Sequence, residues 1–76
     1  MDSLNNEFIG KCCKLNDDIY TNNNNEIPKN SNVIILEIEY NVFKNFNRIK
    51  LLHEGKIFYF ATRIKLSYWL QILNEK

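Results

Sequence analysis

The sequence predicts a small all-β domain, and three observations support this. Two apolar-rich runs flank Glu54-Gly55, and Gly at the second central position of a two-residue turn is typical of a β-hairpin. The β-branched and apolar run 33–40 predicts a further strand. The connection 16–32 is dense in Asn and Asp, which favour turns. With two further runs at 8–15 and 70–73, we expect one domain with strands at 8–15, 33–40, 48–53, 56–61 and 70–73.

The hairpin over 48–61 has a register that its turn fixes. His53 is expected opposite Lys56, and pairing continues residue by residue away from the turn. Because side chains alternate between the faces of a strand, one face is wholly apolar and the other is mixed. A slip of one residue would expose the aromatic side chains, so we expect the register to be well specified. The apolar face comprises Ile49, Leu51, Phe58 and Phe60, and the mixed face comprises Lys50, Leu52, Ile57 and Tyr59.

The chain before the hairpin supplies two strands and one long connection. Residues 1–7 are expected to form a loose terminus, and the first strand, 8–15, to place Cys13 and Leu15 in the core. Gly10 would allow close packing or a bulge in that strand.

The connection 16–32 is too long to be structureless in a compact domain, so it is expected to fold over as a hairpin-like excursion. Tyr20 is expected to pack back on the domain, while 22–25 form an exposed tip.

The second strand, 33–40, has two faces of different character. Glu37 and Glu39 lie on one face, so the other face is expected in the core. The predicted core face comprises Ile34, Leu36, Ile38 and Tyr40. The connection 41–47 is expected to be exposed, with Phe43 and Phe46 partly anchored.

The chain after the hairpin continues with an exposed connection, 62–66, that carries Arg63 and Lys65. One turn of 3₁₀ helix at 67–69 then leads to the last strand, 70–73. A helix over 64–73 remains an alternative, because its apolar residues also have helical spacing.

Composition narrows the class of protein. The net charge is +1, with ten basic and nine acidic residues, so there is no global nucleic-acid signature. No apolar run is long enough to cross a membrane, and we expect no membrane association. Two adjacent cysteines, Cys12 and Cys13, fit a reducing, cytoplasmic setting. Heavy use of Asn, Ile and Lys suggests an AT-rich genome, either of a bacterium or of a phage or virus. For a phage or viral protein, the expected location is the host cytoplasm or the virion.

The order of these elements resembles the SH3-like small β-barrel of bacterial and phage type. Residues 27–33, IPKNSNV, look like the IPKGTxG approach to the second strand of such barrels, with Asn30 and Asn32 where those sequences carry Gly. GKIFYF at 55–60 and SYWL at 67–70 are similar to their last hairpin, 3₁₀ turn and final strand. The resemblance covers residues 8–73 and implies a closed five-stranded barrel.

The resemblance does not extend to the proline-peptide groove of signalling SH3 domains. Asp17, Asp18 and Tyr20 are similar to the acidic long loop of those domains. No Trp stands near 40–46 and no Pro precedes Tyr68, so the aromatic groove that docks polyproline is not expected.

Catalysis by this chain is not expected. His53 stands beside a tight turn, where a solvated side chain is the simplest interpretation. Asp17 and Asp18 have no further acidic ligand at metal-binding spacing, and Cys12-Cys13 with one histidine cannot fill a zinc site. We therefore expect no metal, no cofactor and no small-molecule substrate.

Binding of a protein partner, or self-association, is the favoured class of function. The aromatic side chains exceed what so small a core can bury, and aromatics are enriched in interfaces. The candidate protein-interaction residues are Phe43, Phe46, Tyr59, Tyr68 and Trp69. The alternative is nucleic-acid binding through a basic face of the hairpin and the following loop. The residues of that face would be Arg48, Lys50, Lys56, Arg63 and Lys65.

Overall fold

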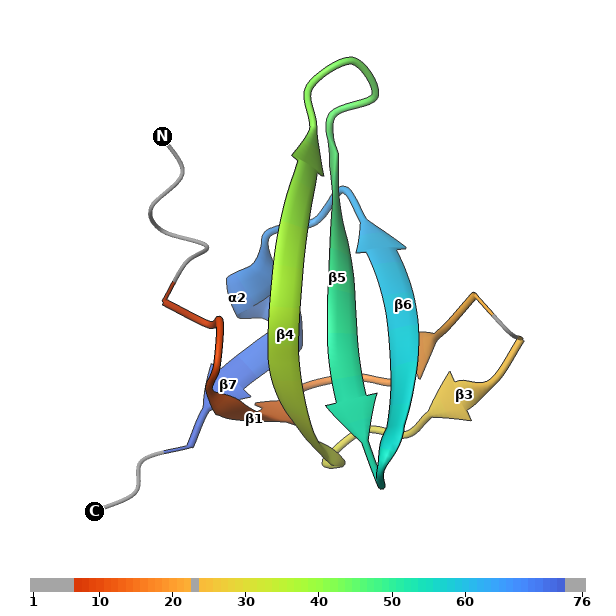
Figure 1. Cartoon of the computed structure of the whole chain (residues 1–76), viewed down its shortest axis with the longest axis vertical. Coiled ribbons are helices and arrows are strands. Elements are labelled where there is room, and N and C mark those ends of the chain that lie inside the picture. The colour runs from red at the N-terminus through yellow and green to blue at the C-terminus, as the bar shows by residue number, and fades with distance from the viewer. Residues whose placement is uncertain (1–6, 23, 74–76) are drawn as a thin grey trace.

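The computed structural model describes residues 7–22 and 24–73, and within them the chain is predominantly β (Figure 1). Of the predicted loose terminus, 1–7, all but Glu7 lies outside the described residues. The elements are β1 (Cys12–Leu15), β2 (Ile19–Tyr20), β3 (Glu26–Ile27), β4 (Asn32–Asn41), β5 (Phe46–His53), β6 (Lys56–Thr62), α2 (Leu66–Trp69) and β7 (Leu70–Ile72).

Five of the strands form one antiparallel sheet in the order β6-β5-β4-β1-β7, and β2 pairs with β3. The predicted closed barrel is not observed: within the described residues the sheet is open, with β6 and β7 as its two edges. At the edge of β6 the long connection takes the place that a closing strand would have. The Asn22 N–H donates to the Tyr59 carbonyl at 3.0 Å, and the Asn22 Oδ1 accepts from the Tyr59 N–H at 3.3 Å.

The predicted hairpin is confirmed. His53 faces Lys56, Leu51 faces Phe58, and the intervening pairs follow the predicted register. Glu54 (φ 52°) and Gly55 (φ 79°) are both left-handed, which is the backbone of the mirror-image turn that suits twisted strands. The apolar face of the hairpin turns inward, where Leu51 is fully buried.

The predicted core face of the second strand is wrong over its first half. Ile34 is 38% exposed, whereas its neighbours Val33 and Ile35 are buried. The neighbouring strand explains this orientation, because β1 pairs Cys13 with Val33 and places both in the core.

A β-bulge then reverses the alternation of β4. Ile35 faces Leu51 and Glu37 faces Lys50, so Leu36 is an extra residue opposite no partner. Beyond the bulge Ile38 packs on the core as predicted, and Leu36 is half-buried. Tyr40 is 51% exposed, because the sheet there extends past the core.

The first strand is shorter than predicted. It begins at Cys12, because a turn precedes it in which Gly10 takes a φ of +80°. This turn breaks the alternation of side chains between the two faces. In a continuous strand Phe8 and Cys13 would lie on opposite faces, whereas in the structure both are buried. Cys13 and Leu15 are buried, as predicted.

The long connection folds as the predicted hairpin, with Ile19 opposite Ile27 and Tyr20 opposite Glu26. Ile19 and Ile27 are in the core. Tyr20 does not pack back on the domain, since it is 67% exposed. The alternation of this two-residue strand turns Tyr20 outward when Ile19 is inward.

The C-terminal part confirms a short helical turn followed by a strand, and the alternative of a helix over 64–73 is wrong. The turn is α rather than 3₁₀, because the Leu70 N–H reaches the Leu66 carbonyl four residues earlier. Leu66 and Leu70 complete the core.

Candidate protein-binding surface

The five predicted aromatic residues do not form one patch. Trp69 is half-buried against the core, with its ring centroid 5.1 Å from that of Phe60 in an edge-to-face arrangement. Its indole N–H donates to the Thr62 hydroxyl at 2.9 Å. Both the apolar ring and the polar N–H of Trp69 therefore contact other parts of the domain. Tyr68 is 51% exposed, and its hydroxyl donates to Asp17 at 3.2 Å. This hydrogen bond raises the pKa of Tyr68, and the charge of Asp17 adds to the effect.

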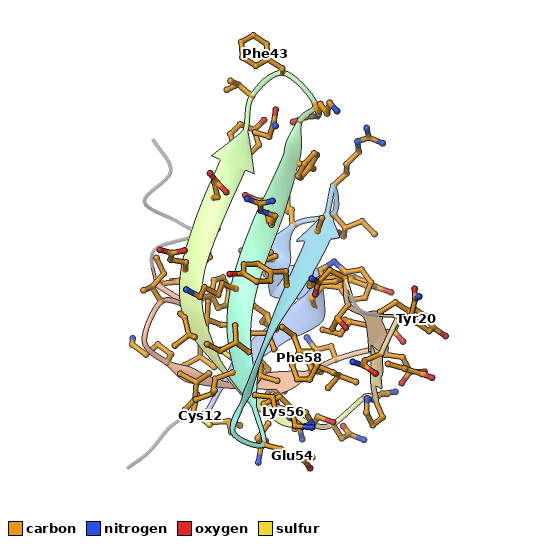
Figure 2. The ribbon with its side chains drawn as sticks, turned by 45° about the vertical axis from the view of Figure 1, so that its right-hand side comes forward. Cys12, Tyr20, Phe43, Glu54, Lys56 and Phe58 are labelled. Carbon is orange, nitrogen blue, oxygen red and sulfur yellow. The ribbon has the colours of Figure 1, made fainter. Side chains whose placement is uncertain are left out.

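The turn between β4 and β5 extends beyond β6 and α2 at one end of the sheet (Figure 1). It carries Val42, which is 66% exposed, and Phe43, which is 95% exposed. Figure 2 shows Phe43 pointing away from the turn, so the expectation that it is partly anchored is wrong. We refer to Val42 and Phe43 as the apolar tip. Phe46 at the start of β5 is half-buried, as expected.

Polar groups hold the turn that carries the apolar tip. The Asn45 N–H donates to the Asn41 carbonyl at 2.7 Å, and the Lys44 N–H donates to the Asn41 Oδ1 at 3.0 Å. Asn45 takes a left-handed φ of 57°, which Asn tolerates better than most residues. The Tyr40 hydroxyl donates to the Asn45 Oδ1 at 2.5 Å. The turn therefore forms without any contact from the Phe43 ring.

The predicted basic residues also do not form one stripe. Arg48 donates to Glu39 at 3.0 Å, and Lys50 lies opposite Glu37 in the register. These glutamates offset the positive charge along the middle of β5. The other three residues lie apart: Lys56 follows the turn at Glu54, whereas Arg63 and Lys65 follow the opposite end of β6. Arg63 Nε donates to the Lys44 carbonyl at 3.3 Å.

Two hollows flank the end of β6. The first has a volume of about 560 Å³ and lies between β2 and β6, with Tyr20, Asn22, Arg48, Tyr59 and Ala61 among its lining residues. The second, of about 420 Å³, is lined by Phe46, Ala61, Thr62, Arg63 and Ile64. Because both include Ala61, we refer to them together as the edge groove. The Arg48 guanidinium lies 5.9 Å from the centre of the Tyr59 ring, within the range of a cation–π interaction.

The cysteines and the histidine are not arranged as a nucleophile and base. Burial, together with the neighbouring thiol Cys12, raises the pKa of Cys13 to about 11, so its thiol stays protonated at neutral pH. Cys12 is exposed and shares a face with Ile34 and Leu52, whereas His53 follows Leu52 on the other face.

His53 is less solvated than expected. Its side chain is only 16% exposed, and its Nδ1 lies 3.1 Å from the Asn32 carbonyl, to which one tautomer donates. Among the residues that the structure describes, no three His, Cys, Asp or Glu side chains come together as a metal site. Within the same residues, no helix is long and apolar enough to span a membrane.

Comparison with protein-family models, curated proteins and solved structures found no significant match. Sequence analysis missed Val42 at the tip and Tyr20, Ala61 and Ile64 at the edge groove. The apolar pair Val42-Phe43 between Asn41 and Lys44 was a signal for an exposed tip, whereas the groove depends on how β2 lies beside β6.

Proposed function

We propose that this chain is a non-catalytic protein-interaction module that docks on a larger assembly as a small accessory or structural subunit. The apolar tip is the docking element, and the exposure of Phe43 is the observation that carries the proposal. Transfer of an exposed Phe side chain into an apolar pocket is worth about 1.5–3 kcal/mol. A partner pocket that receives Phe43 would recover this free energy, which the isolated chain forgoes.

Two features support a docking role over a folding role for the tip. Hydrogen bonds between polar groups hold the turn, whereas Val42 is 66% and Phe43 95% exposed, so the two apolar side chains contribute little to its geometry. The turn also lies beyond the rest of the sheet, where a partner can reach it without a clash with β6 or α2 (Figure 1). Aromatic anchors in a partner pocket are typical centres of protein interfaces.

We further propose that the fold is an SH3-like small barrel whose sheet has stayed open. The strand order β7-β1-β4-β5-β6 and the helical turn directly before β7 support this class. An AT-rich phage or viral assembly, or one of an AT-rich bacterium, is the kind of assembly that the composition favours.

Nucleic-acid binding remains the rival function, and the ion pair between Arg48 and Glu39 counts against it. The two functions differ in their dependence on salt. Release of counterions makes binding to phosphates weaken steeply as salt rises, whereas burial of Phe43 does not release ions.

The test is native mass spectrometry of the complex that co-purifies with the chain, at low and at high salt. We expect a protein complex that survives high salt and that Phe43→Ser abolishes. Ile57→Ser is the matched control, because Ile57 is 50% exposed on β6 near the opposite end of the sheet. A complex that persists in Phe43→Ser, or that contains nucleic acid and dissociates at high salt, would contradict the proposal.

A further inference from the structure

The outer edge of β6 offers main-chain groups in a fixed order. The Tyr59 N–H and carbonyl both point away from β5, because both bond to Asn22. Groups of every second residue point the same way in an antiparallel strand, so those of Ala61 and Ile57 also point outward. The two-residue turn gives the same result. It makes His53 and Lys56 a hydrogen-bonded pair, and such pairs alternate with non-hydrogen-bonded pairs along the hairpin. Ala61 and Arg48 are then a non-hydrogen-bonded pair, so the Ala61 N–H and carbonyl point away from β5.

Asn22 shows what kind of group this edge accepts. Its main-chain N–H takes the place of a strand donor at 3.0 Å, and its side-chain oxygen takes the place of a strand carbonyl at 3.3 Å. Among the residues that the structure describes, the hydrogen bonds of the long connection to β6 are confined to Tyr59. The outward N–H and carbonyl of Ala61 lie directly beyond it, and the edge groove opens on both sides of that residue.

The edge groove has the size and the chemistry of a peptide site. Its larger hollow, at about 560 Å³, lies within the range of about 300–1,000 Å³ that is typical of ligand sites. Tyr20, Tyr59 and Phe46 supply aromatic surface. The charged residues among its described lining are Arg48 and Arg63, and no described carboxylate lines either hollow. Arg48 is paired with Glu39 at 3.0 Å, so Arg63 is the charge that favours an acidic occupant.

We propose that the edge groove binds one extended, acidic peptide segment of a partner protein, which pairs with β6 at Ala61 as an added strand. Main-chain hydrogen bonds to Ala61 set its position, an apolar side chain lies against Tyr59, and a carboxylate approaches Arg63. This adds a second contact to the proposed docking function and does not depend on the apolar tip. A second copy of the chain fits less well, because Asn22 interrupts the long edge that pairing of two β6 strands would need.

The test is a titration of the full-length, ¹⁵N-labelled chain, followed by NMR. The probe is the peptide acetyl-Glu-Val-Phe-Val-Glu-amide, in which Phe and both Glu side chains lie on one face of an extended strand. We expect the largest shifts at the amides of Tyr59, Ala61 and Arg63, and none at Phe43. Two control peptides separate the contributions: one has Lys in place of both Glu, and one carries an N-methyl group on Phe, which removes a strand donor. Each is expected to bind at least about tenfold more weakly, as expected when one good polar contact is lost.

Two variants place the site on the chain. Ala61→Pro removes the outward N–H without loss of a ladder bond, and Pro is tolerated at such edge positions. It should weaken binding about tenfold. Ile57→Pro is the matched control, because it removes an outward N–H on the other side of Asn22, and it should leave affinity unchanged. Arg63→Gln should weaken the Glu peptide and not the Lys peptide, which keeps the test decisive if the Pro variants fail to fold.

Failure of this inference is distinguishable from failure of the tip. Phe43→Ser should leave peptide affinity unchanged even if it abolishes the docking complex. Equal binding of the Glu and Lys peptides, shifts confined to the tip, tighter binding of oligothymidylate than of the peptide, or concentration-dependent shifts at Ala61 without peptide would each overturn the proposal.

Discussion

The two ends of the β4–β5 ladder are built differently. At one end, the first residues of β4 pair with β1 on one side and with β5 on the other, and the two-residue turn at Glu54 is close by. At the other end, Glu37–Asn41 pair, among the described residues, with β5 alone, and a four-residue turn carries the apolar tip. Figure 2 shows Glu54, Lys56 and Cys12 gathered at the first end and Phe43 isolated at the second.

This difference separates the residues that make the fold from those that are available to a partner. The end covered by β1 contains Cys13, Val33, Ile35 and Leu51, each at most 1% exposed. The free end exposes Tyr40, Val42 and Phe43. Substitutions at the covered end should therefore change stability, and those at the free end should change binding.

The largest effect is expected from Leu51→Ala. Leu51 is fully buried and faces Ile35 and Phe58, so its removal leaves a cavity that rigid strands cannot close. We expect a loss of about 2–5 kcal/mol in the free energy of unfolding, measured by urea denaturation. Lys50→Ala in the same strand is the control and should stay within about 0.5 kcal/mol. A loss below about 1 kcal/mol for Leu51→Ala would mean that the covered end is not the source of stability.

A smaller effect is expected at the two-residue turn. Gly55 has a φ of +79°, so Gly55→Ala should destabilise the chain by about 1–2 kcal/mol, although nothing would contact the added methyl group. Glu54→Asn should act in the opposite direction, because Asn adopts the left-handed region more readily than Glu. The measurement is the midpoint of thermal unfolding. Equal effects of the two substitutions would show that the turn geometry is not what fixes the hairpin.

The sequence predicted the hairpin well because its information is local. Glu54-Gly55 sets the turn, and the cross-strand pairs from His53–Lys56 to Ile49–Phe60 follow because each step away from the turn adds one residue on each strand. It predicted β4 poorly because the orientation of β4 depends on β1 and on the bulge at Leu36. The first half of β4, 33–36, is a run of consecutive apolar residues that is compatible with either face inward, and the pairing of Cys13 with Val33 in the core decides between them.

The candidate site divides in the same way. Phe43 could be predicted as a contact residue because it lies in a short polar connection between two strands. Its full exposure could not be predicted, because it depends on how far the β4–β5 ladder extends beyond the core. Trp69 was predicted as a contact residue, and the structure shows in addition that β6 brings Phe60 against its ring and Thr62 to its indole N–H. Ala61 carries no sequence signal, since its contribution is an outward main-chain group.

Alkaline pH offers a milder perturbation of the covered end. Burial raises the pKa of Cys13 from 9.0 to about 11, so the folded chain keeps this proton at pH values at which the unfolded chain has lost it. The contribution of the buried thiol to stability is therefore complete below about pH 9 and declines as the pH rises towards about 11.

The measurement is the midpoint of urea unfolding between pH 8 and pH 11, compared between variants. Cys13→Ala should flatten the decline relative to the native chain. Cys12→Ser should preserve most of it, because Cys12 is exposed. Identical curves for the native chain and Cys13→Ala would show that Cys13 does not titrate as its burial implies.

The smallest effect on stability is expected from Phe43→Ser, the variant with the largest expected effect on docking. With Phe43 95% exposed and its turn held by Asn41 and Asn45, the free energy of unfolding should change by no more than about 0.5 kcal/mol. Asn45→Ala is the matched control in the same turn, and its left-handed φ of 57° predicts a loss of about 1 kcal/mol. A loss above about 1 kcal/mol for Phe43→Ser would mean that the ring packs on the domain in solution. Its exposure would then no longer argue for a partner, because a side chain that stabilises the isolated chain needs no second protein to explain it.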